Sequence, residues 1–311
     1  MSGADLGRRT LLGFGAATAA VAVTGAPAAA ATGAPTPGIR GLREGNAAGV
    51  HYVTAGSGEP LVLVPGWPQT WWEFHKIIPE LARRYRVIAV DLPGIGGSRP
   101  TAGDKKSMAA AIHGMVRKLG LSSVHIAGHD IGAMVAFSFA ANHRDATRTV
   151  TIMDVAHPDE FLYQVPLLVP PGQVHPWWFA FNQVHGLPEK LLAGRGARHL
   201  VDHLCELLLV DQSAVGPRDR AIYAAAYDTP AAIRAGNSWY QQLHQDIEDQ
   251  KSYGPITVPM LGIASLASPY LEQQLVPRGT DVRIVQAPTS GHFVPEEQPA
   301  TVVDALTALI G

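Results

Sequence analysis

The sequence predicts an α/β fold with a mostly parallel central sheet, helices on both faces of that sheet and an inserted helical lid. After about residue 41, short apolar runs alternate with amphipathic segments of helix length, which is typical of parallel strands connected by covering helices. Between residues 157 and 253 this alternation stops, and the chain becomes helical and aromatic. The length of 311 residues, 47% of them hydrophobic, is sufficient for one large domain with such an insertion.

The first 31 residues are typical of a targeting segment. Arg8 and Arg9 precede a weakly hydrophobic run rich in Ala and Gly, and the small residues at positions 28–31 suit a cleavage site. We expect a twin-arginine signal peptide over residues 1–31 and secretion of the mature protein to the extracellular space. An uncleaved N-terminus is the alternative. We expect no stable membrane span, because no later stretch reaches about 18 uninterrupted apolar residues.

The expected core comprises residues 32–156 and 254–311, and the expected lid comprises residues 157–253. We expect strands at six short apolar runs bounded by turn residues, residues 61–64, 86–91, 124–127, 149–153, 259–263 and 282–285. We expect helices where apolar residues recur with helical spacing, over residues 72–83, 106–119, 132–142 and 301–310. Because open parallel sheets bind ligands beyond the carboxyl ends of their strands, we look for the site there.

Composition excludes several classes of function. The formal net charge is -2, with both signs scattered along the chain, which gives neither a basic face for nucleic acid nor a polybasic tract for a membrane. Cys205 is the single cysteine, so an intrachain disulfide and a thiolate metal site are excluded. The histidines lack a metal-binding spacing such as H-E-x-x-H, and no P-loop is present. We therefore expect no metal or cofactor and a small-molecule substrate. The sequence leaves a homodimer open.

One turn carries the strongest chemical signal. The strand expected at residues 124–127 leads into Gly128-x-Asp130-x-Gly132, and a helical pattern follows, as in the turn that presents a nucleophilic serine in many hydrolases. A carboxylate at the apex is nucleophilic at neutral pH without a base. It is a poor nucleophile toward esters and amides, because the adduct would expel it again. Its natural target is a saturated carbon with a leaving group. The alternative is that Asp130 caps the following helix.

Four motifs follow expected strands in order, and they are VPGWPQTWWEF, GHDIG, MDVAHP and TSGHFVPEE. With these motifs the chain resembles the α/β-hydrolase fold family, and within it the epoxide hydrolase and haloalkane dehalogenase group, which uses an aspartate nucleophile. The resemblance covers almost all of the chain after the leader. The order Asp130, Asp154, His292 is consistent with it.

The resemblance implies a base and an orienting acid. An ester between enzyme and substrate must be hydrolysed, and His292 in SGHF is the candidate base for activating water. Many relatives place the acid that orients this histidine after the strand at residues 259–263, but LGIASLASPY has no acidic residue. We therefore predict Asp154, at a position that other relatives use, with Asp159 and Glu160 as weaker alternatives.

The same resemblance implies an oxyanion site at two backbone N–H groups. These are the N–H of Ile131, directly after the nucleophile, and that of Trp67 in the first loop. Family members usually carry His-Gly-x-Pro with a cis bond before the proline, whereas this chain has Pro65-Gly66-Trp67-Pro68. Replacing that histidine by Pro65 removes a loop hydrogen bond.

The leaving group distinguishes the possible reactions. Relatives that release a halide commonly place Trp after the nucleophile, where this chain has Ile131, and relatives that take fluoroacetate carry an arginine that HDIGAM lacks. Both departures argue against dehalogenation, although Trp67 keeps it open. Epoxide hydrolases protonate the epoxide oxygen from the lid, and Tyr240 resembles one of their two donors. Trp177 or Trp178 lies at the other position, where an indole N–H can orient the oxygen but cannot supply a proton.

The leading hypothesis is therefore a cofactor-free epoxide hydrolase that acts on a hydrophobic epoxide. The alternatives are a dehalogenase with the same aspartyl ester and a binding protein that keeps the fold without catalysis. For the lid aromatics the alternative is a packing role.

Overall fold

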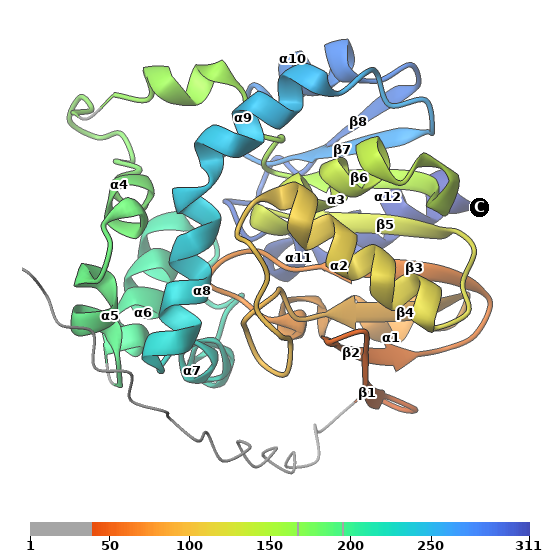
Figure 1. The fold of residues 1–311 in the computed structure, drawn as a ribbon, viewed down its shortest axis with the longest axis horizontal. Helices are drawn as coiled ribbons and strands as arrows, with labels where there is room; N and C mark the ends of the chain where they lie inside the picture. Colours follow the sequence, from red (N-terminus) through yellow and green to blue (C-terminus); the bar gives the residue numbers. More distant parts are fainter. Residues whose placement is uncertain (1–38, 167, 195) are drawn as a thin grey trace, which may run out of the picture. The chain divides into compact units, whose positions relative to one another are not determined.

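The computed structural model describes residues 39–166, 168–194 and 196–311, so the predicted signal peptide lies outside the described residues. The described chain forms an eight-stranded sheet in the order β1-β2-β4-β3-β5-β6-β7-β8 (Figure 1). The strands are β1 Arg43–Ala47, β2 Val50–Ala55, β3 Glu59–Val64, β4 Tyr85–Val90, β5 Val124–His129, β6 Thr147–Met153, β7 Met260–Ala264 and β8 Val282–Gln286.

The sheet is mostly parallel, as the sequence predicts. The six strands from β3 to β8 pair in parallel, whereas β1 and β2 form an antiparallel edge, in which β2 pairs with β4. The sequence prediction missed these two strands. The reason is visible in β1, whose residues REGNA are largely exposed and therefore lack the apolar run that reveals a buried strand.

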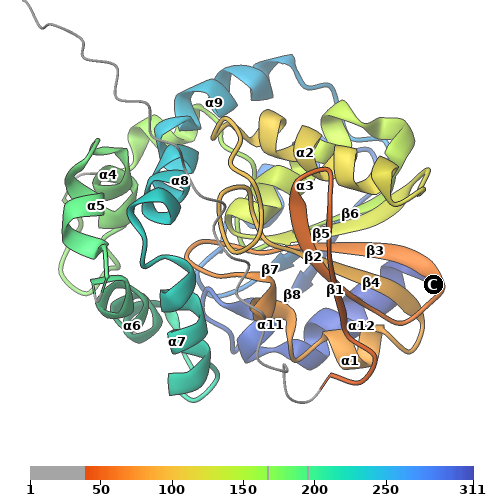
Figure 2. The same cartoon turned by 60° about the horizontal axis from the view of Figure 1, so that its bottom comes forward.

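Helices cover both faces of the sheet, and alternate residues of the central strands point to opposite faces. Val62 and Val64 of β3 pack in the apolar cluster that contains residues of α2 (Lys105–Lys118) and α3 (Ile131–Asn142). Leu61 and Leu63 pack in the cluster on the other face, with α1 (Ile78–Leu81) and α12 (Pro299–Ile310). Figure 2 shows these two helix pairs on opposite sides of the sheet.

The helix predicted over residues 72–83 is wrong. The chain there forms a 3-10 turn, η1 Trp71–Phe74, and then the short α1 helix. Pro79 stands in the first turn of α1, where it has no N–H to continue a preceding helix and disfavours helical backbone in the residue before it. This break places the side chain of Glu73 beneath the strand ends, which matters for the site.

Between β6 and β7 the chain leaves the sheet and forms helices that we call the cap, residues 155–253 (Figure 1). They are η3 Glu160–Gln164, α4 Trp177–Gln183, α5 Leu187–Leu192, α6 Gly196–Leu208, α7 Pro217–Ala226, α8 Pro230–Gln241 and α9 Leu243–Ser252. The remaining short elements are η2 Arg144–Ala146, α10 Leu271–Leu275, η4 Val276–Arg278 and α11 Val294–Glu297. In the part of the chain that the structure describes, no helix is both long and apolar enough to cross a membrane.

A buried ion pair joins the cap to the core. Lys105 Nζ, at the start of α2, lies 2.7 Å from Asp246 Oδ2 in α9, and both side chains are fully buried. The same ammonium donates to the carbonyl of Trp239, and the other Asp246 oxygen accepts from the Lys105 backbone N–H at 2.7 Å. This contact fixes α8 and α9 against α2.

Candidate active site

The turn between β5 and α3 holds Asp130 in a conformation that few residues adopt. Its φ is 50° and its ψ is -121°, in a region where non-glycine backbone is strained. Two glycines are required around it. A Cβ on Gly128 would lie 2.0 Å from the Gly132 carbonyl oxygen, and one on Gly132 would lie 2.1 Å from the Val64 carbonyl oxygen. The Asp130 side chain makes no capping hydrogen bond to α3, so the helix-cap alternative does not describe it.

The Asp130 carboxylate is held from two sides. The backbone N–H of Trp67 donates to Oδ1 at 2.9 Å, and His292 Nε2 lies 3.6 Å from Oδ2. The Trp67–Pro68 bond is cis, as the resemblance implies. Ile131 begins α3 directly after the carboxylate and its side chain is buried in the core, so it can serve the site only through its backbone N–H.

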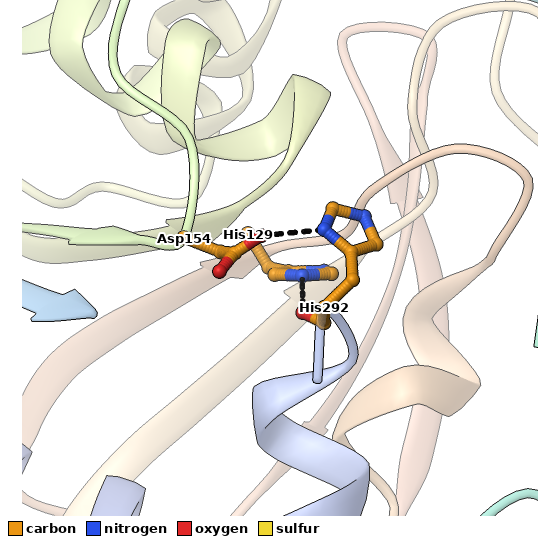
Figure 3. A group of neighbouring side chains, drawn as sticks. All are labelled: His129, Asp154 and His292. Carbon is orange, nitrogen blue, oxygen red and sulfur yellow. Dashed lines mark hydrogen bonds and ion pairs between the residues drawn. The ribbon is translucent and has the colours of Figure 1, made fainter. Parts of the chain in front are cut away.

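His292 and Asp154 are 138 residues apart in sequence and meet in the structure. His292 Nδ1 lies 2.5 Å from Asp154 Oδ2, and Figure 3 shows this contact. Burial alone would raise the pKa of Asp154, but His292, helped by His129 and Ser265, outweighs burial and lowers the pKa. The carboxylate therefore stays charged and can hold the imidazole in one tautomer. The weaker candidates are occupied elsewhere, since Asp159 pairs with Arg278 and Glu160 pairs with Lys251.

Sequence reasoning missed Ser265, whose hydroxyl donates to the other oxygen of Asp154. Ser265 directly follows β7, which is the position where many relatives place the acid. Its position at a strand end was the available signal, but a serine at a strand end does not by itself indicate a functional role.

Sequence reasoning also missed His129, which the structure places in two polar contacts. Its Nδ1 lies 2.9 Å from Glu73 Oε1, and its Nε2 lies 2.7 Å from the backbone carbonyl of His292 (Figure 3). Burial opposes a charge on this imidazole, but Glu73, together with Asp130 and Asp154, outweighs burial and raises the pKa of His129 to about 9. His129 is therefore protonated at neutral pH.

His129, Asp154 and His292 lie close enough together to be considered as metal ligands, with one ligand atom from each within 4.8 Å of the others. Both nitrogens of His129 already have partners, and His292 Nδ1 is bonded to Asp154. A protonated imidazole has no lone pair for a metal. The donor set therefore fits a hydrogen-bonded network and does not fit a metal centre.

A cavity of about 750 Å³ opens from Asp130 and His292 toward the cap. Tyr240 lines it, and its ring makes edge contacts with Trp67 and Phe179 at centroid distances of 5.4 and 5.5 Å. The hydroxyl makes no hydrogen bond with any residue that the structure describes. Burial, and then the charge of Asp130, raise the pKa of Tyr240 well above its usual value, so the phenol stays protonated and can donate.

The structure distinguishes the two lid tryptophans. Trp178 lines the cavity, whereas Trp177 lies outside the lining and its ring packs near Phe181 and His203 at centroid distances of 5.6 and 5.7 Å. The assignment of Trp177 to the site is therefore corrected. Neighbouring residues in α4 point about 100° apart, and the cavity lies on the side of Trp178 and Phe179, which both line it.

The cavity is mainly apolar and carries no cationic side chain. Among the described residues that line it, none is lysine or arginine. His157 belongs to the lining, and burial followed by the charges of Lys105 and Arg278 lowers its pKa to about 3. It is therefore neutral. This surface suits an uncharged ligand better than an anion.

A strained nucleophile turn at the carboxyl edge of a mostly parallel sheet is the defining feature of α/β-hydrolase enzymes. Residues 59–183 match the family described as alpha/beta hydrolase fold. The chain is 34% identical over 275 residues to the soluble epoxide hydrolase of Corynebacterium sp. (strain C12), covering 83% of this chain and 92% of that protein. It therefore belongs to the α/β-hydrolase fold family, in the group of epoxide hydrolases and haloalkane dehalogenases, and is a hydrolase.

Two further similarities are relevant. The fluoroacetate dehalogenase of Burkholderia sp. is 28% identical over 275 residues, which cover 80% of this chain and 86% of that protein. The solved structure of the epoxide hydrolase CorEH without ligand superposes with a TM-score of 0.70 at 31% identity, covering 86% of this chain and 97% of that one. Both candidate reactions thus occur among similar proteins.

Proposed function

We propose that this protein is an epoxide hydrolase that opens an epoxide to a vicinal diol through a covalent ester on Asp130. The observation that carries the proposal is that Asp130 lines an apolar cavity together with Tyr240, with His292 Nε2 at 3.6 Å from its carboxylate. The similarity to proteins named as epoxide hydrolases supports the same reaction.

In the first step, Asp130 Oδ2 attacks one epoxide carbon and the bond from that carbon to the ring oxygen breaks. The electron pair of the broken bond stays on the ring oxygen, which takes the proton of the Tyr240 hydroxyl. Oδ1 remains bonded to the Trp67 N–H, so this hydrogen bond orients the carboxylate for attack. Trp178, which lines the cavity, can orient the epoxide oxygen.

In the second step, water attacks the Asp130 carboxyl carbon while His292 Nε2 takes one of its protons. The negative charge develops on Oδ1, where the N–H groups of Trp67 and Ile131 stabilise it. One such donor is typically worth about 10²–10³-fold in rate. Asp154 stabilises the imidazolium. The ester C–O bond then breaks and the diol leaves with a proton from His292. Asp130 is left as a carboxylic acid, and its loss of a proton to solvent balances the proton that the Tyr240 tyrosinate takes up.

The cavity supports a neutral, bulky substrate. A volume of about 750 Å³ lies within the range of sites for drug-sized ligands. The absence of lysine and arginine from the described lining leaves a carboxylate such as fluoroacetate without a counter-charge, and burying an unpaired charge is costly.

A dehalogenase with the same intermediate is the second candidate, favoured by the similarity to the fluoroacetate dehalogenase and by Trp67 in the first loop. The indole nitrogen of Trp67 packs against α8, where a Cβ on Gly236 would lie 3.2 Å from it. Trp67 lines the cavity, so its indole N–H is one possible donor to a halide, but Ile131 supplies no second side-chain donor beside it. A non-catalytic binding protein is disfavoured, since the chain holds both a nucleophile and a base in contact distance.

The experiment that tests the proposal is a single turnover in heavy-oxygen water with enzyme in excess. We expect the label in the carboxyl group of Asp130 and unlabelled oxygen in the diol, because water attacks the enzyme ester and not the substrate. The Asp130→Asn variant is the matched control and should form no ester. Running the assay with neutral epoxides, haloalkanes and fluoroacetate separates the two reactions. Diol without label in Asp130 would defeat the covalent route.

We also propose export by the twin-arginine route, supported by Arg8 and Arg9 before an Ala/Gly-rich run. Expression in an export-competent host should give extracellular protein that begins near residue 32. Arg8→Lys/Arg9→Lys should hold the protein in the cell, and equal secretion of this variant would exclude the route.

A further inference from the structure

Two ionisable side chains that the proposed reaction does not use are completely buried beneath the site. Glu73, in η1, and His129, at the end of β5, have 0% side-chain exposure and lie 2.9 Å apart. Taking two charges out of water is energetically costly, and their attraction does not always repay that cost. Apolar residues could fill the same space without this cost, so packing alone does not explain the pair. Its role should therefore lie in the polar contacts that it makes.

Each member of the pair reaches a different loop of the site. Glu73 Oε2 accepts from the backbone N–H of Gly66 at 2.9 Å, directly before Trp67, whose own N–H holds the Asp130 carboxylate. His129 Nε2 donates to the backbone carbonyl of His292 at 2.7 Å. The pair thus connects the oxyanion loop, the nucleophile turn and the loop that carries the base.

The hydrogen positions follow from the charge state. Neutral imidazole has one N–H, whereas imidazolium has two, and His129 faces an acceptor from each nitrogen. Only the protonated form satisfies both the Glu73 carboxylate and the His292 carbonyl. The other ionisable groups near this ring are Asp130, Asp154 and His292, and the two carboxylates favour the same charge.

We propose that the Glu73–His129 pair is a positioning device. It holds the backbone of His292 and the Gly66–Trp67 turn at fixed positions relative to the Asp130 carboxylate. The inference rests on the proposed function. The turn at Pro65 lacks the histidine that family members usually carry, and Glu73 holds this turn through the Gly66 N–H. The arm through His129 Nε2 acts on ester hydrolysis alone, because His292 is the base of that step, whereas the arm through Gly66 and Trp67 acts on both steps.

Three variants separate the arms. His129→Asn keeps an amide N–H near the position of Nδ1, toward Glu73, and loses the reach to the His292 carbonyl. His129→Gln extends an N–H near the position of Nε2 and keeps that reach. Glu73→Gln is the isosteric control. Its oxygen still accepts from Gly66, and a neutral His129 still donates from Nε2 to the His292 carbonyl, so these two hydrogen bonds remain while the ion pair loses its charge.

The test measures the two steps separately by rapid quench and intact-protein mass spectrometry with one neutral epoxide. We expect His129→Asn to form the ester within about threefold of the wild-type rate and to hydrolyse it about 10- to 100-fold more slowly, the effect of a base displaced by about 1 Å. His129→Gln and Glu73→Gln should hydrolyse the ester within about fivefold of wild type.

Each alternative result has a defined meaning. Equal slowing of both steps in His129→Asn, or ester hydrolysis as slow in His129→Gln as in His129→Asn, would return the pair to a general structural role and overturn the inference. Unchanged hydrolysis in His129→Asn would also overturn it. If the wild-type protein converts no epoxide, the proposed function fails instead. Ester formation in each variant serves as the internal measure of correct folding.

Discussion

Replacing His292 with glutamine should separate the two chemical steps most clearly. Ring opening depends on the Asp130 carboxylate, which keeps its 2.9 Å hydrogen bond from Trp67. Ester hydrolysis depends on a base beside that carboxylate, where His292 Nε2 lies at 3.6 Å. A glutamine amide cannot accept the proton of water at neutral pH. General base catalysis by histidine contributes about 10²–10⁴-fold, which corresponds to about 3–5 kcal/mol in the barrier of the second step alone.

The assay is intact-protein mass spectrometry after mixing His292→Gln with a slight excess of an epoxide that the wild-type protein converts. We expect protein heavier by the mass of one substrate, at close to full occupancy, and peptide mapping should assign the addition to Asp130. In the wild-type protein the same species should appear only transiently. The double variant Asp130→Asn/His292→Gln is the control and should remain unmodified.

Two results would contradict this reasoning. If His292→Gln stays unmodified while the wild-type protein still forms diol, no covalent ester lies on the pathway. If the adduct forms but is hydrolysed at the wild-type rate, His292 is not the base, and the 2.5 Å contact between His292 and Asp154 would serve the fold instead.

Three further predictions concern the donor, the cap and pH. Tyr240→Phe should slow ring opening about 10²-fold or more and ester hydrolysis little, as rapid quench can measure, and equal slowing would indicate packing. Asp246→Ala leaves the buried Lys105 unpaired and should lower the free energy of unfolding by about 3–5 kcal/mol in urea titrations, whereas Lys105→Met/Asp246→Leu should lose much less. The pKa of His129 is raised from 6.5 to about 9, so its stabilisation is complete below about pH 6.5 and is lost as pH rises through about 9. The free energy of unfolding should fall across that window, and less so in His129→Gln.

Local sequence was sufficient for the nucleophile turn. A Cβ on Gly128 or on Gly132 would lie about 2 Å from a backbone carbonyl oxygen, so only glycine fits at these two positions. The two glycines therefore allow the turn to be predicted from the sequence. The parallel strands from β3 to β8 were predictable for a similar reason. Their two buried faces need continuous apolar runs, and such runs are visible in sequence.

Contacts between distant residues required the tertiary structure. Trp177 and Trp178 have the same chemistry and adjacent positions, and only the orientation of α4 against α8 decides which of them faces the cavity. The same applies to Ser265, which touches Asp154 only because β6 and β7 are neighbours in the sheet.

The sequence by itself therefore determined the fold class, the turn at Asp130 and the strand ends at which His292 and Asp154 lie, because periodicity and glycine sterics act over a few residues. Only the tertiary structure decided that Glu73 and His129, 56 residues apart in sequence, form a buried ion pair. It also decided that Tyr240 lines the same cavity as Asp130. Such pairs depend on packing among several elements, which no local pattern records.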